Sequence, residues 1–170
     1  KSQFGASILS QMLQELAFAR GHKVKCHIQR NIGGNTDFLN MMNTDRLASK
    51  KISKENVIRS QNDIRGISQK DTFFHAGPSE YIQYHGDNKI ANIHMEMEGF
   101  MGAPVVLDAQ LSVIDSPNSA GVVMDAIRYL KVARDRGMVG SLRGPSAFTQ
   151  KTPPEQLSMR DAIAECDKIS

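Results

Sequence analysis

The chain has 170 residues, of which 40% are hydrophobic and 23% charged, which suits one globular domain or one and a half small ones and argues against a disordered chain. Its formal net charge is only +3, and 6% aromatic residues without Trp argue against a nucleic-acid-binding surface. Two distant cysteines exclude a disulfide framework, and no apolar run reaches the roughly 18 residues of a membrane span. We therefore expect a cytoplasmic protein that binds neither nucleic acid nor membrane.

The N-terminal part of the chain predicts a helix followed by a strand. Apolar residues recur at helical spacing through residues 7–20, and Gly21 is a natural helix stop. Residues 24–30 have the alternation of a strand, and residues 31–37 have the composition of a loop. One face of the predicted strand carries Val24, Cys26 and Ile28.

The middle of the chain predicts antiparallel strands. Residues 81–84 and 90–98 flank the turn sequence HGDNK at 85–89, which indicates a hairpin, and residues 105–114 alternate as a further strand. Consecutive antiparallel strands with helices set apart from them indicate an α+β fold, in which a mainly antiparallel sheet carries helices on one face.

The C-terminal part predicts helices without a strand between them. An amphipathic helix is expected at 120–136, where Gly137 ends it, and a loop at 140–145. A last helix begins at Ser158, with Asp161 three residues on as in a capping box. We expect these helices to pack against something outside the strands.

Five lysines are candidates for an anion site. A single lysine is most often a solvated surface residue, but a cluster of lysines binds phosphate, and mutual repulsion lowers an amine pKa so that it can transfer protons near neutral pH. Composition does not choose between these readings. The lysines are Lys50, Lys51, Lys54, Lys89 and Lys151.

The loop at 31–35 leaves two interpretations open, whereas the histidines argue against one kind of site. The NIGGN sequence is either a plain strand-to-helix turn or a set of backbone N–H groups and amides offered to an anion or sugar. None of the five histidines is paired at i,i+3 or i,i+4, which argues against a histidine metal site.

Five motifs in one order resemble a known family. They are NIGGNTDFLNM at 31–41, LASKKISK at 47–54, GDNK at 86–89, IDSPNSAG at 114–121 and QKTPPEQ at 150–156. Together they closely resemble the C-terminal half of myo-inositol-1-phosphate synthase, in its shorter prokaryotic branch, and the resemblance covers essentially the whole chain.

The resemblance implies an NAD-dependent isomerase that converts D-glucose 6-phosphate to 1L-myo-inositol 1-phosphate. The substrate is oxidised at C5, loses a proton at C6, closes by aldol attack on C1 and is reduced again by the same NADH. It further implies a homo-oligomer, expected to be a tetramer. Residues 1–114 would form the catalytic and tetramerisation sheet domain, and residues 115–170 would pack back on an N-terminal Rossmann domain.

The resemblance also assigns site residues by motif. The substrate- and phosphate-binding residues would be Ser2, Asn31, Asn35, Asp37 and Lys89. The catalytic residues would be Lys50, Lys54, Lys151 and Asp115. The cofactor-binding residues would be Asp115, Ser116 and Asn118. Among them, Lys50 would transfer the C5 hydroxyl proton, Lys54 and Lys151 would stabilise oxyanions, and Lys89 would hold the phosphate.

Two departures from the family pattern limit this assignment. The chain begins at Lys1 without Met, and it contains no G-x-G-x-x-G fingerprint, so we expect a piece of a longer protein whose NAD pyrophosphate site lies elsewhere. Family members use either a divalent metal or a monovalent cation, and the acids Asp37, Asp87 and Asp115 do not decide between them. The alternatives are the substrate domain of another NAD-linked dehydrogenase and an inactive oligomerisation module.

Overall fold

The computed structural model describes residues 1–41, 59, 63 and 72–169. Within them lies a sheet of four strands in the order β2-β1-β3-β4. The strands are β1 (Lys23–Gly33), β2 (Phe73–Tyr81), β3 (Asn88–Glu98) and β4 (Pro104–Ile114). The pairs β1–β3 and β3–β4 are antiparallel and β1–β2 is parallel, which confirms the predicted α+β fold with a mainly antiparallel sheet.

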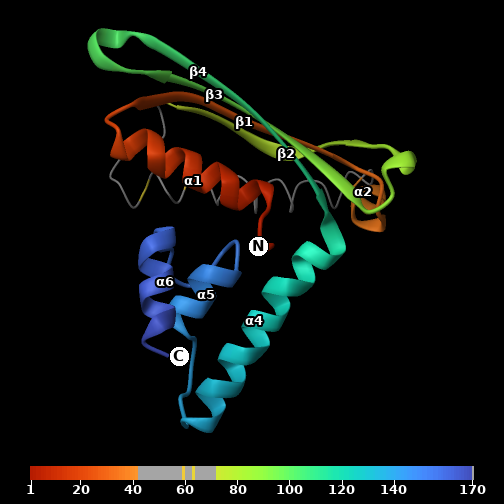
Figure 1. The fold of residues 1–170 in the computed structure, drawn as a ribbon, viewed down its shortest axis with the longest axis vertical. Coiled ribbons are helices and arrows are strands. Elements are labelled where there is room, and N and C mark those ends of the chain that lie inside the picture. Colours follow the sequence, from red (N-terminus) through yellow and green to blue (C-terminus); the bar gives the residue numbers. More distant parts are fainter. Residues whose placement is uncertain (42–58, 60–62, 64–71, 170) are drawn as a thin grey trace.

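Helices gather on one side of this sheet (Figure 1). They are α1 (Ala6–Ala19), α2 (Thr36–Asn40), α4 (Asp115–Asp135), α5 (Arg143–Thr149) and α6 (Met159–Asp167), with short 3₁₀ turns η2 (Gln83–His85) and η3 (Phe100–Gly102). Helix α1 lies along the sheet, α4 leads away from the end of β4, and α5 and α6 pack together beside it (Figure 1). No helix among the described residues is long and apolar enough to cross a bilayer.

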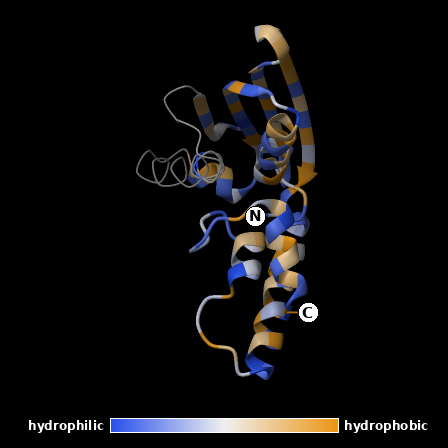
Figure 2. Ribbon diagram, turned by 90° about the vertical axis from the view of Figure 1, so that its left-hand side faces the viewer, coloured by the Kyte–Doolittle hydropathy of each residue, from blue (hydrophilic) through white to orange (hydrophobic). Residues whose placement is uncertain are grey.

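The core lies between α1 and the central strands. Its fully buried members come from α1, β1 and β3, and partly buried apolar residues of α1 and β4 complete it. The bands of apolar and polar residues that alternate along the strands in Figure 2 reflect this one-sided burial. The buried members are Ala17, Val24, Ile93, Met95 and Met97.

The predicted hairpin between residues 81–84 and 90–98 is wrong. Tyr81 is the last residue of β2, residues 83–85 form η2, and β1 lies between β2 and β3 in the sheet. The actual hairpin joins β3 to β4, pairing Asn88 with Ile114 at one end and Glu98 with Pro104 at the other. The turn residues at 85–89 predict that the chain reverses, but they do not predict that β1, which is distant in sequence, lies between β2 and β3.

The predicted face of the first strand and the loop that follows it also need correction. The pairing of β1 with β3 shifts between Val24 and Cys26, so the buried residues beyond Val24 are His27, Gln29 and Asn31 in place of Cys26 and Ile28. The strand then continues through residues 31–33, which composition predicted to be a loop.

Glycines at the end of β1 serve close packing. A Cβ on Gly33 would lie 2.6 Å from the ring of Phe38 in α2, and one on Gly34 would lie 2.4 Å from the Ile82 carbonyl oxygen. The two glycines therefore let α2 and the turn at 82–86 approach the strand end, where the candidate site lies.

The C-terminal segment differs from its prediction in two places. Helix α4 begins at Asp115 rather than at residue 120, and α5 occupies part of the predicted loop at 140–145. The predicted helix stop at Gly137 is confirmed by its φ of 67°. The N-cap at Ser158 is also confirmed, because its side chain accepts a hydrogen bond from the Asp161 N–H, and the Asp161 carboxylate accepts from the Ser158 hydroxyl in return.

Candidate functional site

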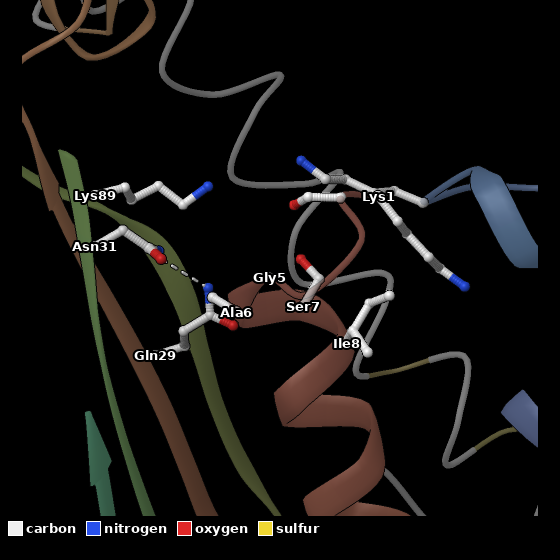
Figure 3. Close-up of a pocket in the computed structure, with 10 residues that line it drawn as sticks. Lys1, Gly5, Ala6, Ser7, Ile8, Gln29, Asn31 and Lys89 are labelled. Atoms are coloured by element: carbon white, nitrogen blue, oxygen red, sulfur yellow. Dashed lines mark hydrogen bonds between the residues drawn. The ribbon is translucent and has the colours of Figure 1, made fainter. Parts of the chain in front are cut away.

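Two adjoining cavities lie where α1 begins, β1 and β3 pass, and α4 begins. The larger has a volume of ≈ 150 Å³ and the smaller ≈ 30 Å³, and the two share Lys1, Ser2, Lys89 and Lys151 as lining residues. Figure 3 shows Lys89 and Asn31 from the strands facing the start of α1 across the smaller cavity. Three lysines around so small a space make it suited to an anion.

The structure brings six of the predicted site residues together here. Ser2, Lys89 and Lys151 line both cavities, Asn31 lines the smaller one, and Asp37 and Asp115 line the larger one. The side chains of Asn35, Ser116 and Asn118 make contacts within the chain next to the cavities. The predicted lysines Lys50 and Lys54 lie outside the described residues.

The N-terminus of α1 faces the smaller cavity. Gly5 is the N-cap and provides no side-chain acceptor, and residues 5–8 line the cavity. The first N–H groups of a helix have no partner within the helix, and they carry partial positive charge. This end of α1 therefore offers partial positive charge to an anion beside the lysines.

Lys89 is paired with an acid that lines the larger cavity with it. Its Nζ lies 2.6 Å from Asp115 Oδ1, and both side chains are largely buried. Asn35 Nδ2 donates to Asp115 Oδ2 at 3.4 Å and to Asp87 Oδ1 at 3.2 Å. Asn35 also caps α2, since its Oδ1 accepts from the N–H groups of Asp37 and Phe38. Asn35 therefore fixes the position of Asp115 and, through it, of Lys89.

Asp87 attaches the start of α4 to the turn before β3. Its carboxylate accepts hydrogen bonds from the N–H and Oγ of Ser116, and its carbonyl accepts from the Asp115 N–H. The hydrogen bond from the Ser116 side chain is the main cause that lowers the pKa of Asp87. Ser116 is thereby committed to an interaction within the chain.

Asn118 holds the N-terminal segment against α4. It accepts from the Phe4 N–H through Oδ1 and donates to the Phe4 carbonyl through Nδ2, while its own carbonyl accepts from the Gln3 N–H. Gly121 lies beneath the same segment, because a Cβ there would lie 2.1 Å from Gln3. These contacts place Lys1 and Ser2 at the cavities.

Lys1 and Gln29 are cavity-lining residues that sequence reasoning missed, and Asp87, considered from the sequence only as a cation ligand, instead holds the start of α4. Lys1 Nζ donates to the Ala147 carbonyl at 2.7 Å, and burial, opposed by the charge of Glu15, lowers the pKa of the Lys1 amine to about 8. The signal for Lys1 was its place beside Ser2. The signal for Gln29 was the run of polar residues at every second position of a buried strand.

The described residues contain no group of three or more His, Cys, Asp or Glu side chains that could hold a metal ion. Within this part of the chain, the charged groups around the cavities are lysines and isolated carboxylates. The site can therefore bind an oxyanion, polarise oxygen atoms and exchange protons through amines.

Comparison with known proteins identifies the family. The family model described as myo-inositol-1-phosphate synthase matches residues 5–116. The inositol-3-phosphate synthase of Mycobacterium tuberculosis is 45% identical over 169 residues, which cover 99% of this chain and 45% of that protein. The inositol-3-phosphate synthase of Corynebacterium glutamicum is 43% identical over 159 residues, which cover 92% of this chain and 44% of that protein. This chain thus spans less than half the length of these relatives.

Solved structures agree with the sequence comparisons. A myo-inositol-1-phosphate synthase-related protein from Thermotoga maritima has a TM-score of 0.75 at 28% identity, over 97% of this chain and 43% of that one. An inositol-3-phosphate synthase from Caenorhabditis elegans shares the fold, with a TM-score of 0.73 at 18% identity, over 99% of this chain and 36% of that one. The chain belongs to the myo-inositol-1-phosphate synthase family.

Proposed function

We propose that this chain is the substrate-binding and catalytic part of an NAD-dependent inositol-3-phosphate synthase, which converts D-glucose 6-phosphate to 1L-myo-inositol 1-phosphate. The observation that carries the proposal is the convergence of the α1 N-terminus with Ser2, Lys89 and Lys151 at the two cavities. Membership of the family supplies the reaction, and the cavities supply a place for a sugar phosphate.

The phosphate would bind at the start of α1. The first N–H groups of α1 and the Ser2 hydroxyl would donate hydrogen bonds to it. Lys89 would supply a positive charge, and Asp115 holds the Lys89 ammonium in place at a distance of 2.6 Å. Asn31 and Asp37 would meet the sugar hydroxyls. Phosphate binding in this place leaves the sugar carbons beside the larger cavity, near Asp115 and Lys151.

The proton steps would be carried by amines. Lys50 would take the proton from the C5 hydroxyl, and Lys54 and Lys151 would stabilise the negative charge that develops on oxygen during enolisation and aldol closure. Of these three, Lys151 lies at the cavities, and the other two lie outside the described residues.

A bound NAD would supply reversible hydride transfer at C5, and Asp115 is the residue of this chain that would lie beside its reactive end. The described residues fit only one end of such a cofactor, because Asp115 lines the larger cavity whereas Ser116 and Asn118 are bonded within the chain. With no Gly-rich fingerprint in this sequence, the pyrophosphate would bind to a Rossmann domain that lies outside it.

That Rossmann domain would cover part of α4. Only two residues of this 21-residue helix are buried, and several of its apolar side chains are about half exposed, among them Val123, Met124, Ile127 and Leu130.

We further propose that the enzyme is a cytoplasmic homo-oligomer, with residues 1–114 as the catalytic and tetramerisation domain and residues 115–170 as the segment that returns to the cofactor domain.

The test is an assay of the intact protein that contains this chain, with glucose 6-phosphate and substoichiometric NAD, followed by ³¹P NMR. We expect inositol phosphate in excess of the NAD supplied, with no net accumulation of NADH. Oxidation of the substrate with one NADH per turnover would instead identify another NAD-linked dehydrogenase. No conversion at all would identify an oligomerisation module.

A further inference from the structure

The buried face of β1 carries polar side chains where a core strand would ordinarily be apolar. His27, Gln29 and Asn31 are 0%, 2% and 1% exposed. They face α1, whose Ser10 is fully buried as well. Buried polar groups are costly unless hydrogen bonds satisfy them, so a run of this kind indicates a defined network.

The direction of every hydrogen bond in this network follows from one backbone carbonyl. The Gly77 carbonyl in β2 can only accept, so the atom of Asn31 that faces it at 2.8 Å is the donor Nδ2. Asn31 Oδ1 then faces Gln29, which must present Nε2 at 3.1 Å. Gln29 Oε1 is left to accept the Ser10 hydroxyl proton at 2.9 Å.

The same reasoning fixes the protonation of His27. Because Ser10 has donated its only proton, its Oγ must accept from His27 Nε2, which lies 3.1 Å away. His27 is therefore the Nε2–H tautomer, and burial lowers its pKa to about 4, so the ring is neutral at neutral pH. The network from His27 to Gly77 thus has a single arrangement of protons.

The network ends at the cavity. Gln29 and Asn31 line its strand side together with Lys89, and Figure 3 shows the hydrogen bond that joins their amides. Within the described residues, each amide atom of Asn31 makes one hydrogen bond, to Gly77 or to Gln29, and keeps one position for a further partner.

We propose that Gln29, Ser10 and His27 are positioning residues, which hold the Asn31 amide so that its remaining Nδ2 hydrogen donates to an oxygen of the sugar phosphate bound beside Lys89. The proposal deepens the proposed function and rests on it for the identity of the ligand. Without Gln29, the Gly77 carbonyl alone would hold the Asn31 amide, which could then swing about that single hydrogen bond and present its remaining Nδ2 hydrogen less precisely to the substrate.

The sheet offers a matched control for this interaction. On the exposed strand pair β3–β4, Gln110 Nε2 donates to Asn92 Oδ1 at 3.0 Å, and neither residue lines the two cavities of the candidate site. Gln29→Met and Gln110→Met each remove the bond to the asparagine while keeping an unbranched side chain of similar size, and Gln29→Met also removes the acceptor of the Ser10 hydroxyl. A difference between the two variants therefore reports on position at the cavity.

The experiment measures the affinity of the intact protein for glucose 6-phosphate by calorimetry, with inorganic phosphate as a second probe and turnover as a separate readout. Losing one neutral hydrogen bond corresponds to about a three- to tenfold loss of affinity. We expect that loss for Gln29→Met and a change below twofold for Gln110→Met. In an Asn31→Ala background, Gln29→Met should cause no further loss, because it acts only through Asn31.

Each outcome decides the proposal. Equal affinities for Gln29→Met and the wild type, or full additivity with Asn31→Ala, would overturn it, as would a wild type that binds neither probe. Selective loss of affinity in a protein without synthase turnover would uphold the positioning role and overturn the proposed function.

A second variant covers the case in which Gln29→Met fails to fold. Ser10→Ala removes the hydrogen bond that Ser10 donates to Gln29 in the same network, and we expect a loss of affinity of about threefold. In the 170-residue chain, ¹⁵N NMR of His27 should show the Nε2–H tautomer at pH 7. A Nδ1–H ring would reverse the deduced bond directions and contradict the proposal.

Discussion

Lys89 is the lysine whose surroundings are most completely defined. Its ammonium is held by Asp115 at 2.6 Å, and it lines both cavities. A contact to phosphate is retained from the ground state to the transition state, so it contributes mainly to substrate binding. We expect Lys89→Ala to raise KM for glucose 6-phosphate about ten- to a hundredfold, the range for a hydrogen bond to a charged group, with kcat little changed.

Steady-state kinetics of the intact protein would measure this effect. Lys25→Ala is the matched control, because it removes the same charge from a 3.1 Å ion pair with Glu98 that lies at the other end of the sheet. A fall in kcat at unchanged KM for Lys89→Ala would place Lys89 in the chemical step instead.

His27 makes stability depend on pH. Its pKa falls from the ordinary value of 6.5 to about 4 through burial, so the unfolded chain binds a proton between these values that the folded chain does not. The free energy of unfolding should therefore fall as the pH drops from 6.5 to 4, by at most ~3 kcal/mol. Urea unfolding of the chain at pH 7.5 and 5, with and without His27→Gln, measures this dependence.

His94 provides a control of opposite sign. Hydrogen bonds to Asp108 and then Glu96 raise its pKa, so its contribution to stability is present at low pH and is lost as the pH rises through the raised pKa. His94→Gln should leave the loss of stability between pH 6.5 and 4 in place. If His27→Gln leaves it in place as well, His27 is not buried in the neutral form.

At the level of single residues, it was easier to predict which residues lie near the cavities than to predict which of them form hydrogen bonds with one another. Six predicted residues meet at the cavities because their motifs lie at the ends of strands and helices, which the fold brings together. The roles of Asn35, Ser116 and Asn118 as internal supports could not be predicted. A side-chain amide or hydroxyl binds a ligand or the chain itself equally well, and only tertiary contacts decide which.

Among the helices, the contact of α5 with α6 depends on one glycine. A Cβ on Gly144 would lie 2.7 Å from the Glu165 backbone and 2.8 Å from the Cys166 nitrogen, so the two helices would have to separate. The small core that they share contains Ala147, Leu157 and Ala162. Gly144→Ala should lower the free energy of unfolding by about 1–3 kcal/mol through overpacking.

Denaturant unfolding compares this variant with Gly99→Ala. The added Cβ of Gly99→Ala lies 3.5 Å from His22, an ordinary contact, and its φ of −95° suits any residue. We expect a change within about 0.5 kcal/mol for the control. Equal effects of the two substitutions would show that the close approach of α5 to α6 does not limit stability.

Helices and strands were easier to predict from the sequence than the way the strands pair in the sheet. Periodicity identified the helix at α1, the strands β1, β3 and β4, and the long helix α4, because each pattern is local. The parallel pairing of β1 with β2 and the place of β1 next to β3 depend on contacts distant in sequence. The buried face of β1 was mispredicted because a shift in register moves every later side chain to the other face.

For the whole molecule, we propose that the cofactor site lies mostly outside this chain. The described residues offer Asp115 at the cavity but no phosphate-cradling loop of the dinucleotide-binding kind. The 170-residue chain by itself should therefore be inactive and should bind NAD weakly or not at all. Calorimetric titration with NAD tests this expectation, and a micromolar affinity would refute it.

The central claim is that one site oxidises, cyclises and reduces the same sugar phosphate. The most direct measurement supplies the intact protein with glucose 6-phosphate carrying deuterium at C5, in the presence of substoichiometric NAD, and analyses the product by mass spectrometry and NMR. Because the hydride removed from C5 is returned to the same molecule, we predict inositol 1-phosphate that keeps the deuterium. Loss of the label to solvent, or its accumulation in reduced NAD without a cyclised product, would contradict the account.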